Sequence, residues 1–124
     1  MIRSVHTPQA PEAIGPYAQA IIAGPFVFCS GQLGIDPAAC VLAAGVEEQA
    51  RQALANMKAV LEQAGSAVDK VVKTTIFLKK IEDFGAVNTI YGEFFGSHRP
   101  ARSTVEVSNL PKGALIEIEC IGIL

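Results

Sequence analysis

The stretch VEEQARQALANMKAVLEQA at residues 46–64, followed by VVKTTIFL at residues 71–78, sets the expectation for the whole domain. In the first segment the apolar residues recur at steps of three and four, which aligns them along one side of a helix. Glu47 and Glu48 fall in its first turn, where the positive end of the helix dipole favours acidic side chains, and Gly65 suits its end. The second segment is rich in β-branched residues and predicts a strand. We therefore expect a helix packed against a sheet.

A second helix and further strands are expected around this unit. Spaced apolar residues predict the helix over about residues 82–95, and Gly96 with Pro100 marks its end. Its apolar face comprises Phe84, Val87, Tyr91, Phe94 and Phe95. The other strands are a hairpin within 18–30 that turns at Gly24–Pro25, and single strands at 103–107 and 115–123. The resulting order, ββαβαββ, predicts a single α+β domain over residues 1–124, with both helices on one face of a sheet.

Proline and glycine are expected to interrupt regular structure elsewhere. Three prolines within residues 6–16 predict an extended arm or loop near the start. Gly31 and Gly34 are expected to break the strand that precedes them and to begin a loop. Ser66, three residues before Asp69, predicts the cap of a short helical turn.

The strand at 71–78 carries apolar residues on both of its faces. Val72, Ile76 and Leu78 alternate with Val71 and Phe77, which is typical of a strand buried on both sides. Two helices cover one face only. The chain is 50% hydrophobic and 18% charged, whereas about 25% of residues are charged in a typical protein. Few charged residues are therefore available to cover the other face. We therefore expect a homo-oligomer.

Composition argues against several classes of protein. Ten basic residues against twelve acidic ones give a net charge of −2, so nucleic acid is not the expected partner. The hydrophobic content excludes intrinsic disorder, no apolar run reaches the length of a membrane span, and the first residues, MIRSVHTP, do not resemble a secretory signal. Cys29, Cys40 and Cys120 have neither disulfide-framework nor zinc-site spacing, so reduced thiols in a cytoplasmic protein are expected.

Few residues are suited to chemistry. His6 and His98 fall in expected loops, and no metal-ligand or nucleotide-binding motif occurs. The segment SGQLG at 30–34 is interpreted either as a turn at a strand end or as backbone N–H groups that face a small anion.

The last two strands hold the stronger candidates. Glu117 and Glu119 lie two residues apart and so share one face, opposite the apolar residues of the same strand. By pattern alone they face solvent, and Arg102 forms a surface ion pair. The alternative is a pocket against a neighbouring subunit, where Arg102 would grip a carboxylate through paired N–H bonds and a glutamate would handle water or a proton.

A set of segments in fixed order carries a family resemblance. They are AIGPY at 13–17, SGQ at 30–32, QARQALAN at 49–56, VVKTTIFL at 71–78, FGAVN at 84–88, Tyr91 with FF at 94–95, PARS at 100–103 and IEIE at 116–119. Together they resemble the Rid (YjgF / L-PSP) family of reactive-intermediate imine deaminases over nearly the whole chain.

The resemblance implies a chorismate-mutase-like fold with a mixed sheet, assembled as a homotrimer with its sites between subunits. It implies hydrolytic deamination of small 2-imino acids, the tautomers of enamines such as 2-aminoacrylate and 2-aminocrotonate, to 2-oxo acids and ammonia. Neither a cofactor nor a metal is expected. The expected ligand is therefore a small 2-imino or 2-oxo acid.

The resemblance also assigns roles to residues. Arg102 matches the arginine that binds the substrate carboxylate, and Glu117 matches the glutamate that positions and activates water. The remaining pocket residues that it implies are Tyr17, Ser30, Gly31 and Asn88. Of these, Tyr17 is expected to come from the adjacent subunit. For Tyr17 and Asn88 a turn or helix-cap hydrogen bond is the alternative, while Glu119 is expected to be structural or peripheral.

Two departures from the family pattern bear on specificity. Many members carry cysteine two residues after the arginine, whereas this chain has Thr104, whose hydroxyl is still able to bind a ligand. The loop at 96–99 is shorter than is typical and is expected to border the pocket. Two alternative functions stay open: an endoribonuclease of the L-PSP type, and a non-catalytic regulatory trimer that binds small carboxylates.

Overall fold

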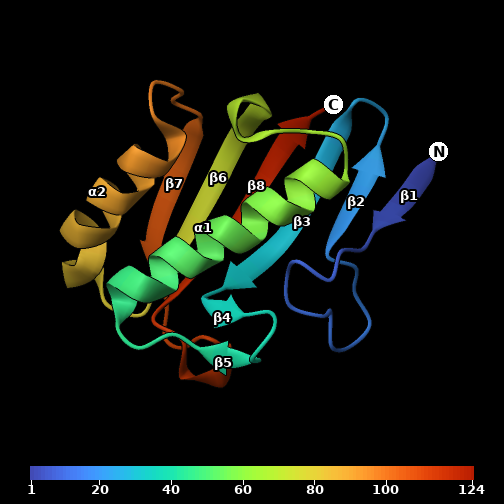
Figure 1. Ribbon diagram of the computed structural model, residues 1–124. Coiled ribbons are helices and arrows are strands. Elements are labelled where there is room, and N and C mark those ends of the chain that lie inside the picture. The colour runs from blue at the N-terminus through green and yellow to red at the C-terminus, as the bar shows by residue number, and fades with distance from the viewer.

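The computed structural model describes residues 1–124 and shows a twisted sheet with two helices on one of its faces (Figure 1). The strands are β1 (Ile2–Val5), β2 (Ala20–Ala23), β3 (Phe26–Leu33), β4 (Ile35–Asp36), β5 (Val41–Leu42), β6 (Val71–Leu78), β7 (Ala101–Glu106) and β8 (Ile116–Ile123). The helices are α1 (Val46–Gln63) and α2 (Phe84–Phe95), and short 3₁₀ turns span Val68–Lys70, Ile81–Asp83 and Pro111–Gly113. Neither α-helix has the length and apolar character needed to cross a membrane.

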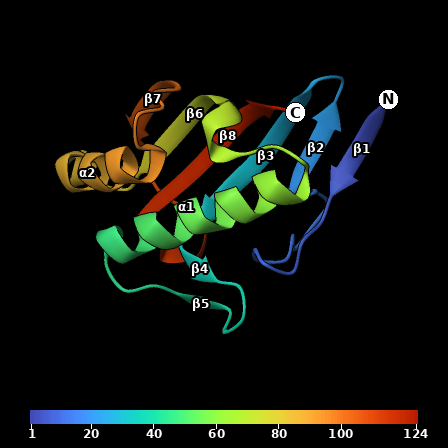
Figure 2. The ribbon, with the colours of Figure 1, turned by 45° about the horizontal axis from the view of Figure 1, so that its top comes forward.

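The main sheet has six strands in the order β1-β2-β3-β8-β6-β7, and β4 pairs only with β5. Strands β6 and β7 run parallel, while every other pair in the sheet is antiparallel. A parallel pair needs a crossover connection, and α2 supplies it. This crossover places α2 over β6 and β7, beside α1, as the turned view shows (Figure 2). The predicted α+β class and the placing of both helices on one face are confirmed.

Helix α1 forms because its apolar stripe has a sheet to cover. Leu54, Met57 and Leu61 are buried on this stripe and pack against β3 and β8. Burial of each such side chain stabilises the fold by about 1.5–3 kcal/mol. The predicted helix limits hold closely, since Gly65 and Gly96 have positive φ directly beyond the two helix ends.

Several predicted strand limits were wrong. The short strands β4 and β5 lie in a segment predicted as a loop, because each has only two residues and so shows no periodic pattern. Strand β1 was not predicted, because only Val5 of its four residues is buried. Strand β7 begins at Ala101 instead of Ser103, because its parallel pairing with β6 starts there, opposite Lys73. Arg102 therefore lies inside the strand.

Two local predictions were also wrong. Gly31 does not end β3, which continues to Leu33 past a register shift between Cys29 and Gln32. The glycine therefore belongs to a β-bulge. Ser66 does not cap the turn at Val68–Lys70, because its hydroxyl donates a hydrogen bond to the carbonyl oxygen of Ile123 at 2.6 Å.

One face of the sheet is left without helices. A register shift after Val71 buries that residue with Ile76 and Leu78, whereas Val72 is exposed, contrary to the predicted alternation. Large apolar side chains on this open face include Phe26, Phe28, Val105 and Ile123, which are 38–43% exposed. The uncovered face expected from the sequence is therefore present, and it carries several exposed apolar side chains.

Gly34 provides a test of the packing of α1. A Cβ at this position would lie 2.4 Å from the Cα and 2.5 Å from the carbonyl oxygen of Gln49 in α1. We expect Gly34→Ala to lower the free energy of unfolding by about 1–3 kcal/mol, because the helix must shift to make room. Urea denaturation at a fixed protein concentration measures this change.

Gly92→Ala is the matched control for Gly34→Ala. A Cβ at Gly92 in α2 meets nothing within 4 Å, so alanine there is expected to raise stability by up to about 1 kcal/mol through its better helix propensity. A Gly34→Ala protein as stable as the wild type would contradict the close contact.

Candidate functional site

Arg102 is held under α2 by one amide and two aromatic rings. It pairs with Thr74 across β6 and β7, which directs its side chain to the helix-bearing face. Its Nη1 donates a hydrogen bond to Oδ1 of Asn88 at 2.8 Å. Its Cζ lies 4.8 Å from the ring centre of Tyr91 and 5.3 Å from that of Phe84, within the range of cation–π contacts. The guanidinium is therefore fixed without any negatively charged partner.

This lack of a counter-ion distinguishes Arg102. The ion pairs of the protein are His6–Glu12 and Arg51–Glu48, and neither involves it. A guanidinium has five N–H donors, and a single hydrogen bond, to an uncharged amide, engages that of Arg102. A half-buried cation with free donors is suited to bind an anion, and its planar fork fits a carboxylate.

Thr104 lies two residues after Arg102 on β7 and therefore on the same face. Its Oγ1 is buried and has no hydrogen-bond partner in the protein. A buried hydroxyl without a partner costs about 1–3 kcal/mol, so a ligand oxygen beside it would relieve this cost. We call Arg102, Asn88 and Thr104, with the rings of Phe84 and Tyr91, the arginine group.

Glu117 lies beside the β3 bulge, on the opposite face of the sheet. In β8 it pairs with Leu33 of β3 and Phe77 of β6. A Cβ on Gly31 would lie only 1.8 Å from Oε2 of Glu117. The carboxylate therefore rests in the space that the missing side chain of Gly31 leaves, and we call Glu117, Gly31 and Ser30 the glutamate group.

The environment of Glu117 favours its protonated form. Burial raises the pKa of its carboxyl group above the ordinary value, and the nearby charge of Glu119 raises it further. Both glutamates lie on one face of β8, as the sequence predicted, with Glu117 half-buried and Glu119 exposed. A carboxyl group with a raised pKa is better matched to proton transfer near neutral pH than an ordinary glutamate.

Ser30 is used to build the bulge. Its hydroxyl donates a hydrogen bond to the carbonyl oxygen of Ala18 at 2.6 Å, and its N–H donates to that of Gln19 at 2.9 Å. Both bonds tie the bulge to the segment that follows Tyr17. Tyr17 itself is 54% exposed, so its side chain is available to a ligand or to another subunit.

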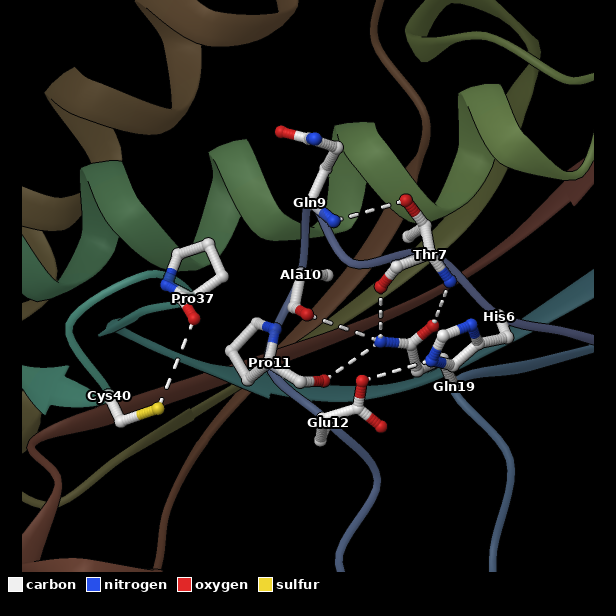
Figure 3. A network of polar contacts seen from close by, with 9 residues as sticks. All are labelled: His6, Thr7, Gln9, Ala10, Pro11, Glu12, Gln19, Pro37 and Cys40. Atoms are coloured by element: carbon white, nitrogen blue, oxygen red, sulfur yellow. Dashed lines mark hydrogen bonds and ion pairs between the residues drawn. The ribbon is translucent and has the colours of Figure 1, made fainter.

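Gln19 organises the loop that leads to Tyr17 (Figure 3). Its side-chain amide is buried, donates to the carbonyl oxygens of Thr7, Ala10 and Pro11, and accepts from the N–H of Thr7 at 2.7 Å. Four hydrogen bonds from one side chain fix the path of a segment that has no regular structure. Sequence reasoning missed this residue, because an isolated glutamine before a strand carries no pattern.

The two groups do not meet within one chain. Arg102 pairs with Thr74 of β6, whereas Glu117 pairs with Phe77, three residues further along the same strand. Because side chains alternate between faces, an odd separation places Arg102 and Glu117 on opposite sides of the sheet. The arginine group unites the predicted residues Arg102, Asn88 and Thr104, and the glutamate group unites Ser30, Gly31 and Glu117.

The histidines are engaged separately. Nε2 of His6 lies 3.0 Å from a carboxylate oxygen of Glu12, and Nε2 of His98 lies 2.7 Å from the carbonyl oxygen of Val71. Neither ring is hydrogen-bonded to a member of the arginine or glutamate group. The structure therefore gives no support to a paired-histidine site.

Comparisons with known proteins extend over almost the whole chain. A family model described as Endoribonuclease L-PSP matches residues 7–124. The chain is 48% identical over 126 residues to a 2-iminobutanoate/2-iminopropanoate deaminase from Salmonella typhimurium, with 99% of this chain and 98% of that protein covered.

Solved structures agree with this match. YyfA from Yersinia pestis, a protein of unknown function of the conserved Rid protein family, superposes with a TM-score of 0.98 at 49% identity and full coverage of both chains, 100% each. TdcF from E. coli, solved with bound serine, superposes with a TM-score of 0.95 at 40% identity and 98% coverage of each chain.

The contact between Gly31 and Glu117 can be tested by nuclear magnetic resonance. We expect Gly31→Ala to fold, because the end of the Glu117 side chain is able to swing away from the added methyl group. Displacement into water removes the burial that raises the pKa of Glu117, so this pKa should fall toward that of an ordinary glutamate. A carbon-detected pH titration of the Glu117 carboxyl group measures it, and an unchanged pKa would contradict the contact.

Proposed function

Because this chain belongs to the endoribonuclease L-PSP family, which includes the YjgF and Rid proteins, we propose that it hydrolyses small 2-imino acids to 2-oxo acids and ammonia. The observation that carries this proposal is the half-buried guanidinium of Arg102, which has free donors and no protein counter-ion. The activity for which the Salmonella typhimurium relative is named supports the substrate class, since 2-iminobutanoate and 2-iminopropanoate are both small carboxylates.

Arg102 binds the substrate carboxylate in this proposal. Two parallel N–H bonds from its guanidinium fix the position and the plane of the acid, and thereby the imine carbon next to it. Thr104 adds a hydroxyl whose oxygen is buried and unpartnered on the same face. Tyr17 and Asn88 complete the pocket, Tyr17 from the adjacent subunit and Asn88 through its bond to Arg102.

Glu117 directs the attacking water. Its carboxylate accepts a proton from water as the water oxygen bonds to the carbon of the N-protonated imine, which gives a neutral tetrahedral carbinolamine. Glu117 returns this proton to the nitrogen. The C–N bond then breaks as the carbinolamine hydroxyl gives its proton to the Glu117 carboxylate, which forms the 2-oxo acid, and Glu117 passes that proton to the departing ammonia, which leaves as ammonium. Glu117 returns to its starting state, and no electron acceptor is required. Ser30 and Gly31 shape the bulge in which this carboxylate rests.

Because Arg102 and Glu117 lie on opposite faces of the sheet, each proposed site requires at least two chains. The arginine group of one copy must meet the glutamate group of the next, so the contact is between unlike surfaces. Contacts of this kind generate rings when the rotation closes, and we propose the homotrimer that the family resemblance implies. The exposed apolar residues of the open sheet face are what such an assembly would cover.

The physiological role that we propose is control of metabolite damage in the cytoplasm, by removal of reactive imines. The three cysteines lack the spacing of a disulfide framework, which is typical of proteins from a reducing compartment. The family description also names an endoribonuclease. The net charge of −2 and the separately engaged histidines favour the deaminase over RNA cleavage.

Mixing two inactive variants tests the shared site. Arg102→Ala should lower kcat/KM for 2-iminobutanoate by about 30-fold or more, since a substrate carboxylate without its cationic partner loses at least about 2 kcal/mol. Glu117→Gln should lower it by about 100-fold or more, since a general base contributes about 10²- to 10⁴-fold. Co-refolding of the two variants in equal amounts should restore about a quarter of the wild-type activity, because in a ring one site in about four then pairs an intact arginine with an intact glutamate.

The control for this mixture is each variant refolded alone, which should stay inactive. Different affinity tags and native mass spectrometry confirm that mixed rings have formed. Mixed rings without recovered activity would refute a site shared between copies. A wild-type protein that binds 2-oxobutanoate but releases no ammonia from the imine would instead identify a regulatory binding module.

The pH dependence of the reaction tests the role of Glu117. Its carboxylate must be deprotonated to accept a proton, so the rate should fall as the pH drops through its raised pKa. The charge of Glu119 contributes to that rise, and Glu119→Gln should therefore move the acidic limb of the pH profile to lower pH. Glu93→Gln, which removes an exposed carboxylate from α2, is the control and should leave the limb in place. A limb that does not respond to Glu119→Gln would contradict this assignment.

A further inference from the structure

Tyr91 links the three elements that surround Arg102. Its hydroxyl oxygen lies 2.6 Å from Oγ1 of Thr74 in β6, and its ring lies under the guanidinium of Arg102 in β7. Thr74 and Arg102 are themselves paired across β6 and β7. Tyr91 projects from α2, which lies over these two strands (Figure 1). The Tyr91 side chain therefore joins α2 to two neighbouring positions of the sheet, Thr74 and Arg102.

Packing alone does not account for this arrangement. Tyr91 is 6% exposed and Thr74 is fully buried, on a face where β6 otherwise presents Val71, Ile76 and Leu78. Phenylalanine and valine would fill similar volumes without two polar groups to satisfy. Burial raises the pKa of the Tyr91 hydroxyl, so the group stays protonated and its hydrogen bond with Thr74 persists at working pH. A buried bond of this kind fixes the tilt of the ring.

We propose that Tyr91, anchored by Thr74, is a positioning residue that orders the Arg102 guanidinium for its anionic ligand. The inference deepens the proposed function, on which it rests for the identity of the ligand as a small 2-oxo or 2-imino acid. An arginine side chain that is already ordered loses less conformational freedom when it binds. The Tyr91 ring occupies a face of the guanidinium and Asn88 engages Nη1, so the other N–H donors remain for the carboxylate.

Three variants separate the ring from its anchor. Tyr91→Leu removes the ring and the hydroxyl, Tyr91→Phe retains the ring, and Thr74→Val removes the anchor without a change of shape. We expect Tyr91→Leu to weaken the binding of 2-oxobutanoate by about 3- to 30-fold and to raise KM for the imine with little change in kcat, because the carboxylate is held equally in ground and transition states.

Loss of the Thr74 hydroxyl has a separate expected effect on ligand binding. Thr74→Val leaves the Tyr91 hydroxyl buried without a partner and should weaken binding, whereas the double variant with Tyr91→Phe removes both polar groups and should bind better than Thr74→Val alone. Phe94→Leu is the matched control, since Phe94 lies on the same helix and packs on Phe95 without contact to Arg102. It should leave 2-oxobutanoate binding unchanged.

The Arg102 side-chain signals in nuclear magnetic resonance provide a readout that does not depend on activity. In the wild type the ring of Tyr91 should shift the guanidinium protons upfield, and Tyr91→Leu should remove the shift and broaden the signals. Wild-type binding and unbroadened Arg102 signals in Tyr91→Leu would overturn the inference. If Tyr91→Leu does not fold, Thr74→Val and its rescue by Tyr91→Phe decide it. A wild type that shows ordered Arg102 signals yet no turnover of imines would count against the proposed function and not against the positioning by Tyr91.

Discussion

Side chains alternate between the two faces of a sheet, and this alternation separates the two charged groups on which the proposed chemistry depends. Arg102 and Glu117 are tied through β6 to positions 74 and 77, an odd number of residues apart. A change of rotamer cannot bring them together, because the sheet itself lies between them. Under the proposed function, a single chain therefore carries the two halves of the site on opposite faces of the sheet. The exposed apolar residues of the open face, Phe26 and Phe28 among them, are consistent with a protein whose working form includes further copies.

A different set of contacts holds the arginine group and the glutamate group in place. The arginine group is built under the crossover helix, where α2 brings Phe84, Asn88 and Tyr91 to a strand edge. The glutamate group depends on a bulge and on a missing Cβ at Gly31, which leaves space for the carboxylate. Hydrogen bonds from Ser30 connect that bulge to the loop that Gln19 organises. Both groups are thus positioned by contacts within the chain before any ligand binds, as the proposed catalysis by orientation requires.

The sequence was informative where periodicity or charge was strong. Both helices, the strand at 71–78 and the pairing of Glu117 with Glu119 on one face could be predicted, because burial imposes a repeat on them. The short strands and the bulge at Gly31 could not be predicted. A glycine that ends a strand and a glycine that leaves space for a carboxylate look the same in a sequence. The sequence pattern indicates only that Tyr91 belongs to an apolar helix face and Thr74 to a β-branched strand, because their hydrogen bond joins residues 17 positions apart.

The choice of an amide beside Arg102 is consistent with an anion-binding role. Asn88 offers an oxygen that accepts one N–H bond, as a carboxylate would, but carries no negative charge. An aspartate in the same place would neutralise the guanidinium and compete with an incoming acid. The aromatic rings act in the same sense, because they stabilise a cation without cancelling its charge. The surroundings of Arg102 thus hold a half-buried cation in place and leave its charge available to a ligand.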